Sequence, residues 1–224
     1  MTDSGTTERP SLSKDVRLRL ALLTDLNALV YIDRKCFPEH YRWQSIYPIG
    51  KKWWKVVIES KASQTLVLED SSGIFAHSVL VFDSGLWNTE SKRRNGSVIV
   101  RVLSALFCTN PAVWRRLLKV ALVRLTYRRP VMNSVVERRS GRIAWAETSA
   151  VLPRMARKGY GSFLIQAREQ RALEAGATFI DTHVDSENVS SRRMNEKAGY
   201  VLISENKHGC LYKKCLADTG RGVE

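Results

Sequence analysis

The chain has 224 residues, 44% of them hydrophobic, which predicts a globular domain with a sizeable core and excludes an intrinsically disordered chain. Its four cysteines form no CxxC pair and have no histidine at metal-ligand spacing, so we expect reduced thiols and no bound metal. The formal net charge is +14, and residues 91–142 hold thirteen Lys/Arg against one acid, a net of +12, so an electrostatic partner is expected to bind there.

Both ends of the chain are polar. Residues 1–14 lack the apolar segment of a signal peptide, and we expect them to form a flexible tail. A single domain is predicted over residues 15–217, followed by a second flexible tail at residues 218–224. Together with the cysteine pattern, this organisation predicts a cytoplasmic protein.

The first part of the domain is predicted to mix strands and helices. Residues 16–20 alternate apolar and basic side chains, which predicts a strand. Thr24 is then expected to cap a helix over residues 25–36 that has one buried face. The pattern continues with a helix at residues 50–61 and a hairpin of two strands, residues 64–68 and 74–82, joined through Asp70–Gly73.

A basic segment follows the hairpin and is predicted to form a helical insertion at about residues 84–141. Apolar residues recur at helical spacing beside arginines from Pro111 to Leu125, which predicts a basic amphipathic helix. No run reaches the roughly twenty apolar residues of a spanning helix. Three roles stay open: the segment packs as an extra helix pair, lies on an anionic membrane surface, or contacts an acidic substrate. Nucleic acid is not favoured, because no zinc finger, helix-turn-helix or aromatic RNA-binding motif accompanies the charge.

The stretch at residues 150–165 combines a strand end, a basic turn at residues 157–161 (Arg-Lys-Gly-Tyr-Gly) and a helix at about residues 162–175. Small residues in such a turn let backbone N–H groups approach an anion, and the helix N-terminus adds a partial positive charge. The turn therefore predicts a phosphate site. A dinucleotide fingerprint is excluded because its third glycine position is Leu164, and a phosphate loop ending in Gly-Lys-Ser/Thr is absent.

A second stretch lies downstream of this helix. Residues 178–184 are rich in β-branched side chains and predict a strand, and residues 190–198 predict a helix. Gly199 is expected to end that helix as a C-cap, with a further strand at residues 200–203.

The two stretches resemble the two signatures of the GNAT superfamily of acyltransferases. The strand, basic turn, Gly159-Tyr160-Gly161 and helix resemble motif A, whose turn holds the pyrophosphate of coenzyme A. The second signature, commonly Glu-Asn … Leu-Tyr-Glu-Lys-Leu-Gly-Phe, matches Glu187-Asn188 and Met194-Asn195-Glu196-Lys197-Ala198-Gly199-Tyr200. Both occur in the expected order within residues 143–203.

This resemblance implies an α/β fold of GNAT type, the acyl-CoA N-acyltransferase fold. We expect a mixed, mostly antiparallel twisted sheet of six or seven strands, flanked by helices and carrying the helical insertion. The strands at residues 143–151 and 178–184 are expected to be parallel neighbours.

The implied activity is that of an N-acetyltransferase, which moves an acetyl or other acyl group from acyl-CoA, most simply acetyl-CoA, to an amine by direct attack. The acceptor stays open: a small-molecule amine such as an amino sugar, an antibiotic amine or a polyamine, a protein amine, or a lipid-linked amine, the last consistent with a peripheral position at an anionic membrane. Acyl chain length and oligomeric state are not predicted. The aromatic residues 38–49 either form part of the acceptor wall or pack as a loop over the core.

The resemblance also implies the site residues. Glu147 would be the base on the strand at residues 142–151, where period two places Trp145, Glu147, Ser149 and Val151 on one face. Its alternative is a strand carboxylate that faces solvent or pairs with an arginine. Backbone N–H groups near Ala150 and Val151 would orient the thioester, and Asn188 would bind the pantetheine arm, cap the next helix, or both. The pyrophosphate would be held by Arg157, Lys158, Gly159, Tyr160, Gly161 and Ser162.

Two positions depart from the family pattern. Ala156 stands where motif A usually begins with Arg or Gln, and positive charge appears instead at Arg157, where glycine is common. Asn195 stands where a tyrosine often protonates the leaving thiolate, and Tyr200, Tyr212, His183 or water are the open substitutes. These departures leave a second hypothesis, a non-catalytic acyl-CoA-binding or membrane-associated module.

Overall fold

The computed structural model describes residues 13, 15–37, 49–90, 142–206 and 209–216, which form a seven-stranded mixed sheet in the order β1-β2-β3-β4-β5-β7-β6. β4 and β5 are its parallel pair, and the other neighbours are antiparallel, as predicted. The strands are β1 (Arg17–Leu20), β2 (Ser63–Asp70), β3 (Gly73–Val81), β4 (Ile143–Val151), β5 (Phe179–Val184), β6 (Val201–Asn206) and β7 (Gly209–Cys215).

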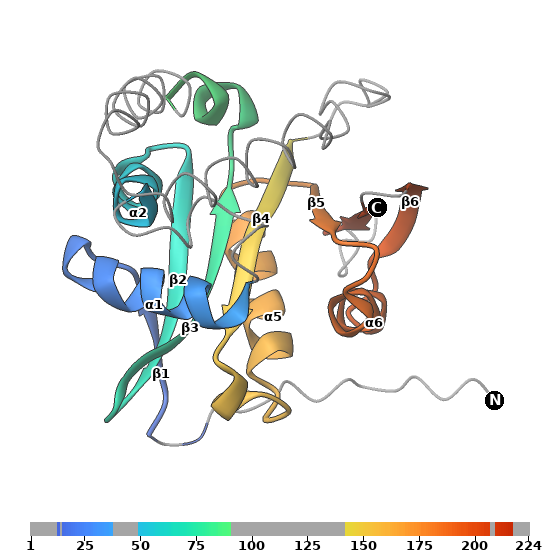
Figure 1. Cartoon of the computed structure of the whole chain (residues 1–224). Coiled ribbons are helices and arrows are strands. Elements are labelled where there is room, and N and C mark those ends of the chain that lie inside the picture. The colour runs from blue at the N-terminus through green and yellow to red at the C-terminus, as the bar shows by residue number, and fades with distance from the viewer. Residues whose placement is uncertain (1–12, 14, 38–48, 91–141, 207–208, 217–224) are drawn as a thin grey trace, which may run out of the picture.

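Helices cover both faces of the sheet. Figure 1 shows α1 (Leu26–Cys36) and α2 (Ile49–Glu59) on one side of strands β1 to β4, and α5 (Tyr160–Glu174) on the opposite side. α6 (Val189–Lys197) lies beside β6 and β7, and short 3-10 helices precede α1 and α5 at Leu23–Asp25 and Pro153–Met155. None of the helices in the described residues is long and apolar enough to cross a membrane.

The chain leaves the sheet after β3 and returns at β4, so residues 82–142 connect two neighbouring antiparallel strands. Residues 84–90 of this connection are helical. The predicted amphipathic helix, its basic charge and the aromatic segment at residues 38–48 all lie outside the described residues, as do most of the predicted tails.

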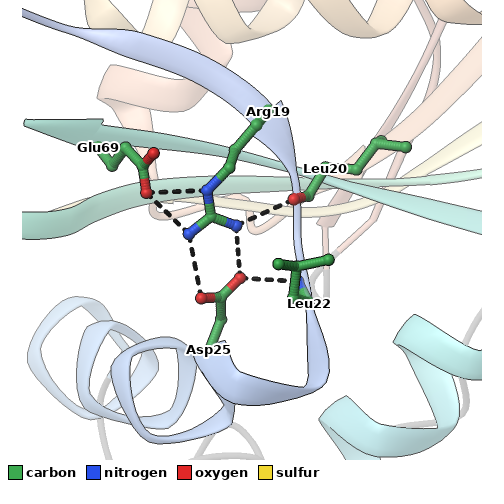
Figure 2. A network of polar contacts seen from close by, with 5 residues as sticks. All are labelled: Arg19, Leu20, Leu22, Asp25 and Glu69. Atoms are coloured by element: carbon green, nitrogen blue, oxygen red, sulfur yellow. Dashed lines mark hydrogen bonds and ion pairs between the residues drawn. The ribbon is translucent and has the colours of Figure 1, made fainter.

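Helix α1 starts differently from the sequence prediction. Thr24 makes no side-chain cap, and the carboxylate of Asp25 instead accepts the Leu22 N–H at 2.7 Å. Arg19 holds that carboxylate with two guanidinium contacts and also pairs with Glu69 of β2 at 2.7 Å (Figure 2). The pKa of Asp25 is lowered because these hydrogen bonds outweigh the burial that alone would raise it. The helix start is therefore fixed by a side-chain network that includes a distant strand.

A buried polar cluster joins helices α1 and α2 to the sheet. Asp33 of α1 accepts a hydrogen bond from Trp54 of α2 at 3.0 Å and contacts His77 Nε2 of β3 at 2.9 Å. All three side chains are almost fully buried, and the Trp54 and His77 rings meet edge to face at 4.7 Å. Because buried polar groups are costly without partners, this cluster fixes how α1 and α2 sit on the sheet. It lies next to β4, since His77 pairs with Ala150.

Candidate active site

β4 and β5 run side by side for only part of their length. Their pairing begins at Ile143 and Phe179 and ends at Ala146 and Thr182, so residues 147–151 have no partner on β5. A β-bulge lies at this point, because Val79 pairs with Thr148 and Leu80 with Ala146, leaving Glu147 as the extra residue. A bulge bends a strand and increases its twist. The two parallel strands therefore separate toward their carboxyl ends, where open α/β sheets bind ligands.

The backbone N–H groups in the half of β4 that has no β5 partner point in defined directions. Leu152 donates its backbone N–H to the carbonyl of Phe75 of β3 at 2.9 Å. Because successive N–H groups of an antiparallel strand point to opposite sides, the N–H of Ala150 also points toward β3. Val151 then directs its N–H toward the open side. The Cys36 thiol, whose pKa burial and nearby Asp33 raise to about 11, donates to the Val151 carbonyl at 3.3 Å. This geometry favours Val151 over Ala150 as a hydrogen-bond donor to a ligand.

The basic turn leads into α5 and follows the open end of β4 after the short 3-10 helix at Pro153–Met155. Gly159 is the N-cap of the helix with φ +83°, and a Cβ added there would meet nothing within 4 Å. Arg157 has φ 62°, in the left-handed region that glycine adopts most easily. Arg157 and Lys158 are exposed, so a turn with two cations and the first N–H groups of a long helix faces solvent.

α5 begins at Tyr160, two residues before the predicted start. The ring of Tyr160 packs on Phe75 at 4.9 Å and Ser162 is half-buried, so both belong to the helix rather than to the loop. Gly161 lies against α6, because a Cβ there would stand 2.7 Å from the sulfur of Met194. The glycine therefore allows the two helices that flank the opening to approach closely.

Asn188 is the N-cap of α6, and its side-chain oxygen accepts the Ser191 N–H at 3.0 Å. The capping role is thus confirmed. Because the cap uses the oxygen, the amide NH2 group of this exposed residue is left to act as a donor.

Glu147 lies in the bulge and its carboxylate accepts the indole N–H of Trp145 at 3.0 Å. The prediction that Ser149 shares this face is wrong. Ser149 contacts Ser78 at 2.7 Å and Arg168 of α5 at 3.4 Å, so it faces the opposite helix layer. The bulge adds one residue and reverses the alternation beyond it.

A second carboxylate, Asp181 of β5, lies nearby and was not among the site residues that the sequence predicted. It pairs in register with Trp145, and only 5% of its surface is exposed. Burial raises its pKa to about 6, against the opposing effect of Lys213, whose ammonium lies 3.9 Å away. An acidic residue within the apolar, β-branched strand at residues 179–184 was the available signal. Trp145 thus hydrogen-bonds one carboxylate, that of Glu147, and pairs in register with the residue that carries the other, Asp181.

Asp181→Asn is expected to stabilise the protein at neutral but not at acidic pH. A carboxyl whose folded pKa is raised stabilises the fold fully below its ordinary value of 3.8, and this contribution is lost as pH rises through about 6. The variant should therefore unfold at a higher temperature than wild type at pH 8, by on the order of 2 kcal/mol in free energy, with little difference near pH 4. Thermal melts across pH measure this, and Glu174→Gln, an exposed carboxylate paired with Arg171, should show no such trend.

Asn195, at the tyrosine position of the family signature, and the two candidate tyrosines are held by other contacts. Asn195 is buried and binds Arg168 through its oxygen at 3.0 Å. The Tyr200 hydroxyl accepts from Arg168 at 3.2 Å, and burial raises its pKa to about 12. Tyr212 donates its hydroxyl to Glu196 at 2.7 Å, and burial followed by that contact raises its pKa. Neither tyrosine is therefore disposed to lose its proton at neutral pH.

The comparisons with known proteins agree with this geometry. The family model described as "Acetyltransferase (GNAT) family" matches residues 120–200, which include β4, α5, β5 and α6. A Staphylococcus aureus N-acetyltransferase superimposes with a TM-score of 0.55 at 13% identity, over 90% of this chain and 98% of that one. The ribosomal-protein-S18-alanine N-acetyltransferase of Escherichia coli superimposes with a TM-score of 0.56 at 10% identity, over 93% of this chain and 99% of that one.

A third structure, the PaiA N-acetyltransferase of Thermoplasma acidophilum in complex with coenzyme A, gives a TM-score of 0.57 at 12% identity, over 89% of this chain and 98% of that one. No curated protein matches the chain by sequence. At these identities the structures establish the fold, and the family model matches the segment that carries both sequence signatures. Residues 120–200 thus match the GNAT acetyltransferase family model, and the described residues have the fold of these N-acetyltransferases.

Proposed function

We propose that this protein transfers an acetyl group from acetyl-CoA to an amine acceptor by direct attack of the amine on the thioester. The observation that carries the proposal is the separation of β4 from β5 beyond Ala146, because the opening leads straight to the basic turn and the start of α5. A long ligand with an anionic group near its middle and a thioester at its end fits this path. The coenzyme A complex of the Thermoplasma relative supports the same ligand.

Each part of the opening has a chemical task in this proposal. The N–H groups at the start of α5, with Arg157 and Lys158, bind the pyrophosphate. The amide of Asn188 binds the pantetheine arm, and the N–H of Val151 orients the thioester carbonyl. Glu147 accepts the proton of the attacking amine, directly or through water.

Calorimetry with acetyl-CoA, combined with a free-thiol release assay over a panel of amines, tests this function. Binding followed by thiol release with at least one amine is the expected result. Binding without release on any amine would favour the non-catalytic acyl-CoA-binding module, for which Asn195 in place of tyrosine is the specific observation. If neither acetyl-CoA nor coenzyme A bound, both functions would be wrong.

A further inference from the structure

Arg168 is a buried cation in the middle of α5. Only 4% of its surface is exposed, and its guanidinium donates to three neutral oxygens: Asn195 at 3.0 Å, Tyr200 at 3.2 Å and Ser149 at 3.4 Å. The guanidinium also lies 5.4 Å from the centre of the Tyr200 ring, and its Nε–H has no acceptor. A sequence signal was present, since Arg168 occupies the apolar stripe formed with Leu164 and Ala172.

No carboxylate in the described part of the chain forms an ion pair with Arg168. The neighbouring Glu169 is bound instead by Lys214 at 2.7 Å. An arginine keeps its charge in proteins, and a buried charge without a counterion is costly. Neutral hydrogen bonds offset only part of that cost, and the unpaired Nε–H adds to it. An anion bound next to Arg168 would offset this cost, which indicates that the side chain serves to bind a ligand rather than to pack the core.

The position of Arg168 in the fold indicates which anion it would bind. It reaches Ser149, in the half of β4 that has no β5 partner, and it lies eight residues beyond the start of α5, which is about 12 Å along the helix axis. It is therefore too far along the helix to bind the pyrophosphate at the turn. The pantetheine arm runs from that pyrophosphate to the sulfur, and the anion formed at its far end is the thiolate.

We propose that Arg168 stabilises the coenzyme A thiolate as it leaves, with Asn195 and Tyr200 as positioning residues. The inference rests on the proposed acyl transfer. The amine nitrogen forms a bond to the carbonyl carbon, its proton passes to the base, and the C–S bond breaks with its electron pair remaining on sulfur. Arg168 offers N–H hydrogen bonds to that sulfur without giving up a proton, and the thiolate later takes a proton from water. Asn195, at the tyrosine position of the family signature, thus holds a cation in place of a proton donor.

The test measures the bound thiol rather than turnover. The dissociation constants of coenzyme A and desulfo-coenzyme A are compared from about pH 6 to pH 9, and thiolate absorbance of the bound coenzyme is titrated in parallel. We expect the thiol of coenzyme A bound to wild type to have a lower pKa than the thiol of free coenzyme A. Between those two pKa values, the preference for coenzyme A over the desulfo form should grow roughly tenfold per pH unit. Arg168→Gln should abolish that growth, and Arg168→Lys should restore part of it.

Arg171→Gln is the matched control, because it removes one positive charge from the same helix at an exposed position. It should leave both dissociation constants and the thiol titration unchanged. A folded Arg168→Gln variant with the wild-type titration would overturn the proposal. If that variant does not fold, the thiol titration of coenzyme A bound to wild type is the deciding measurement. A bound thiol with the same pKa as free coenzyme A would contradict the role of Arg168 while leaving the proposed function intact. Failure of wild type to bind either ligand overturns both.

Discussion

Gly159→Glu is expected to abolish acetyl-CoA binding while the protein remains folded. The carboxylate would extend from the N-cap of α5 into the place proposed for the pyrophosphate, where like charges repel and the first helical N–H groups would bind the new side chain instead. We expect the affinity for acetyl-CoA to fall by more than about 100-fold, measured by calorimetry. The φ of +83° adds strain of about 1–2 kcal/mol, but no neighbouring atom obstructs the Cβ.

The same helix supplies a control for that strain. Gly176 follows the other end of α5 with φ +78°, and its Cβ would also meet nothing within 4 Å. Gly176→Glu therefore introduces the same side chain at a similar backbone angle, far from the turn. It should destabilise the protein by a similar amount and keep acetyl-CoA binding. If both variants lost binding equally, backbone strain would explain the result; if Gly159→Glu bound normally, the pyrophosphate would not lie at this turn.

The sequence predicted the parts of the fold that depend on local patterns. The strands β2, β3 and β4 and the β-branched run of β5 lie where they were expected, within a few residues, and Gly199, which has φ +85°, follows the C-cap residue of α6 directly. The order of strand, turn and helix at the basic turn was also predicted, because glycine and charge at that position constrain the backbone directly. The resemblance to the GNAT family came from these same local patterns, and the family model matches residues 120–200, which carry them.

The sequence did not reveal features that depend on partners far along the chain. The bulge at Glu147 arises from the register between β4 and β3, which the sequence of β4 alone does not contain. The start of α1 depends on Arg19 and Glu69, so the local signal of Thr24 predicted the wrong cap. The contacts of Arg168 also depend on distant partners, because Asn195 and Tyr200 lie 27 and 32 residues further along the chain, although its place in the apolar stripe of α5 was a local signal.

Glu147→Gln is expected to lower kcat by about 100- to 10,000-fold with little change in acetyl-CoA affinity. The glutamine keeps the size of the side chain and a carbonyl oxygen that accepts the Trp145 indole N–H, but it cannot accept a proton. Removal of a general base costs this much when proton transfer is part of the rate-limiting barrier. Steady-state kinetics across pH, with calorimetry on the same variant, separates the loss of catalysis from a loss of binding.

Asp181 is a second candidate for the base, because it is the register partner of Trp145 on the adjacent strand, and Trp145 hydrogen-bonds Glu147. A base must be deprotonated in the working enzyme, and a pKa of about 6 would give Asp181 a strong pH dependence just below neutrality. If Glu147 is the base, Asp181→Asn should keep most of the activity and gain stability at high pH. If Asp181→Asn instead abolishes turnover and Glu147→Gln does not, the base is Asp181, and Glu147 serves to orient Trp145. Equal losses in both single variants, with no further loss in the double variant, would show that the two carboxylates act together.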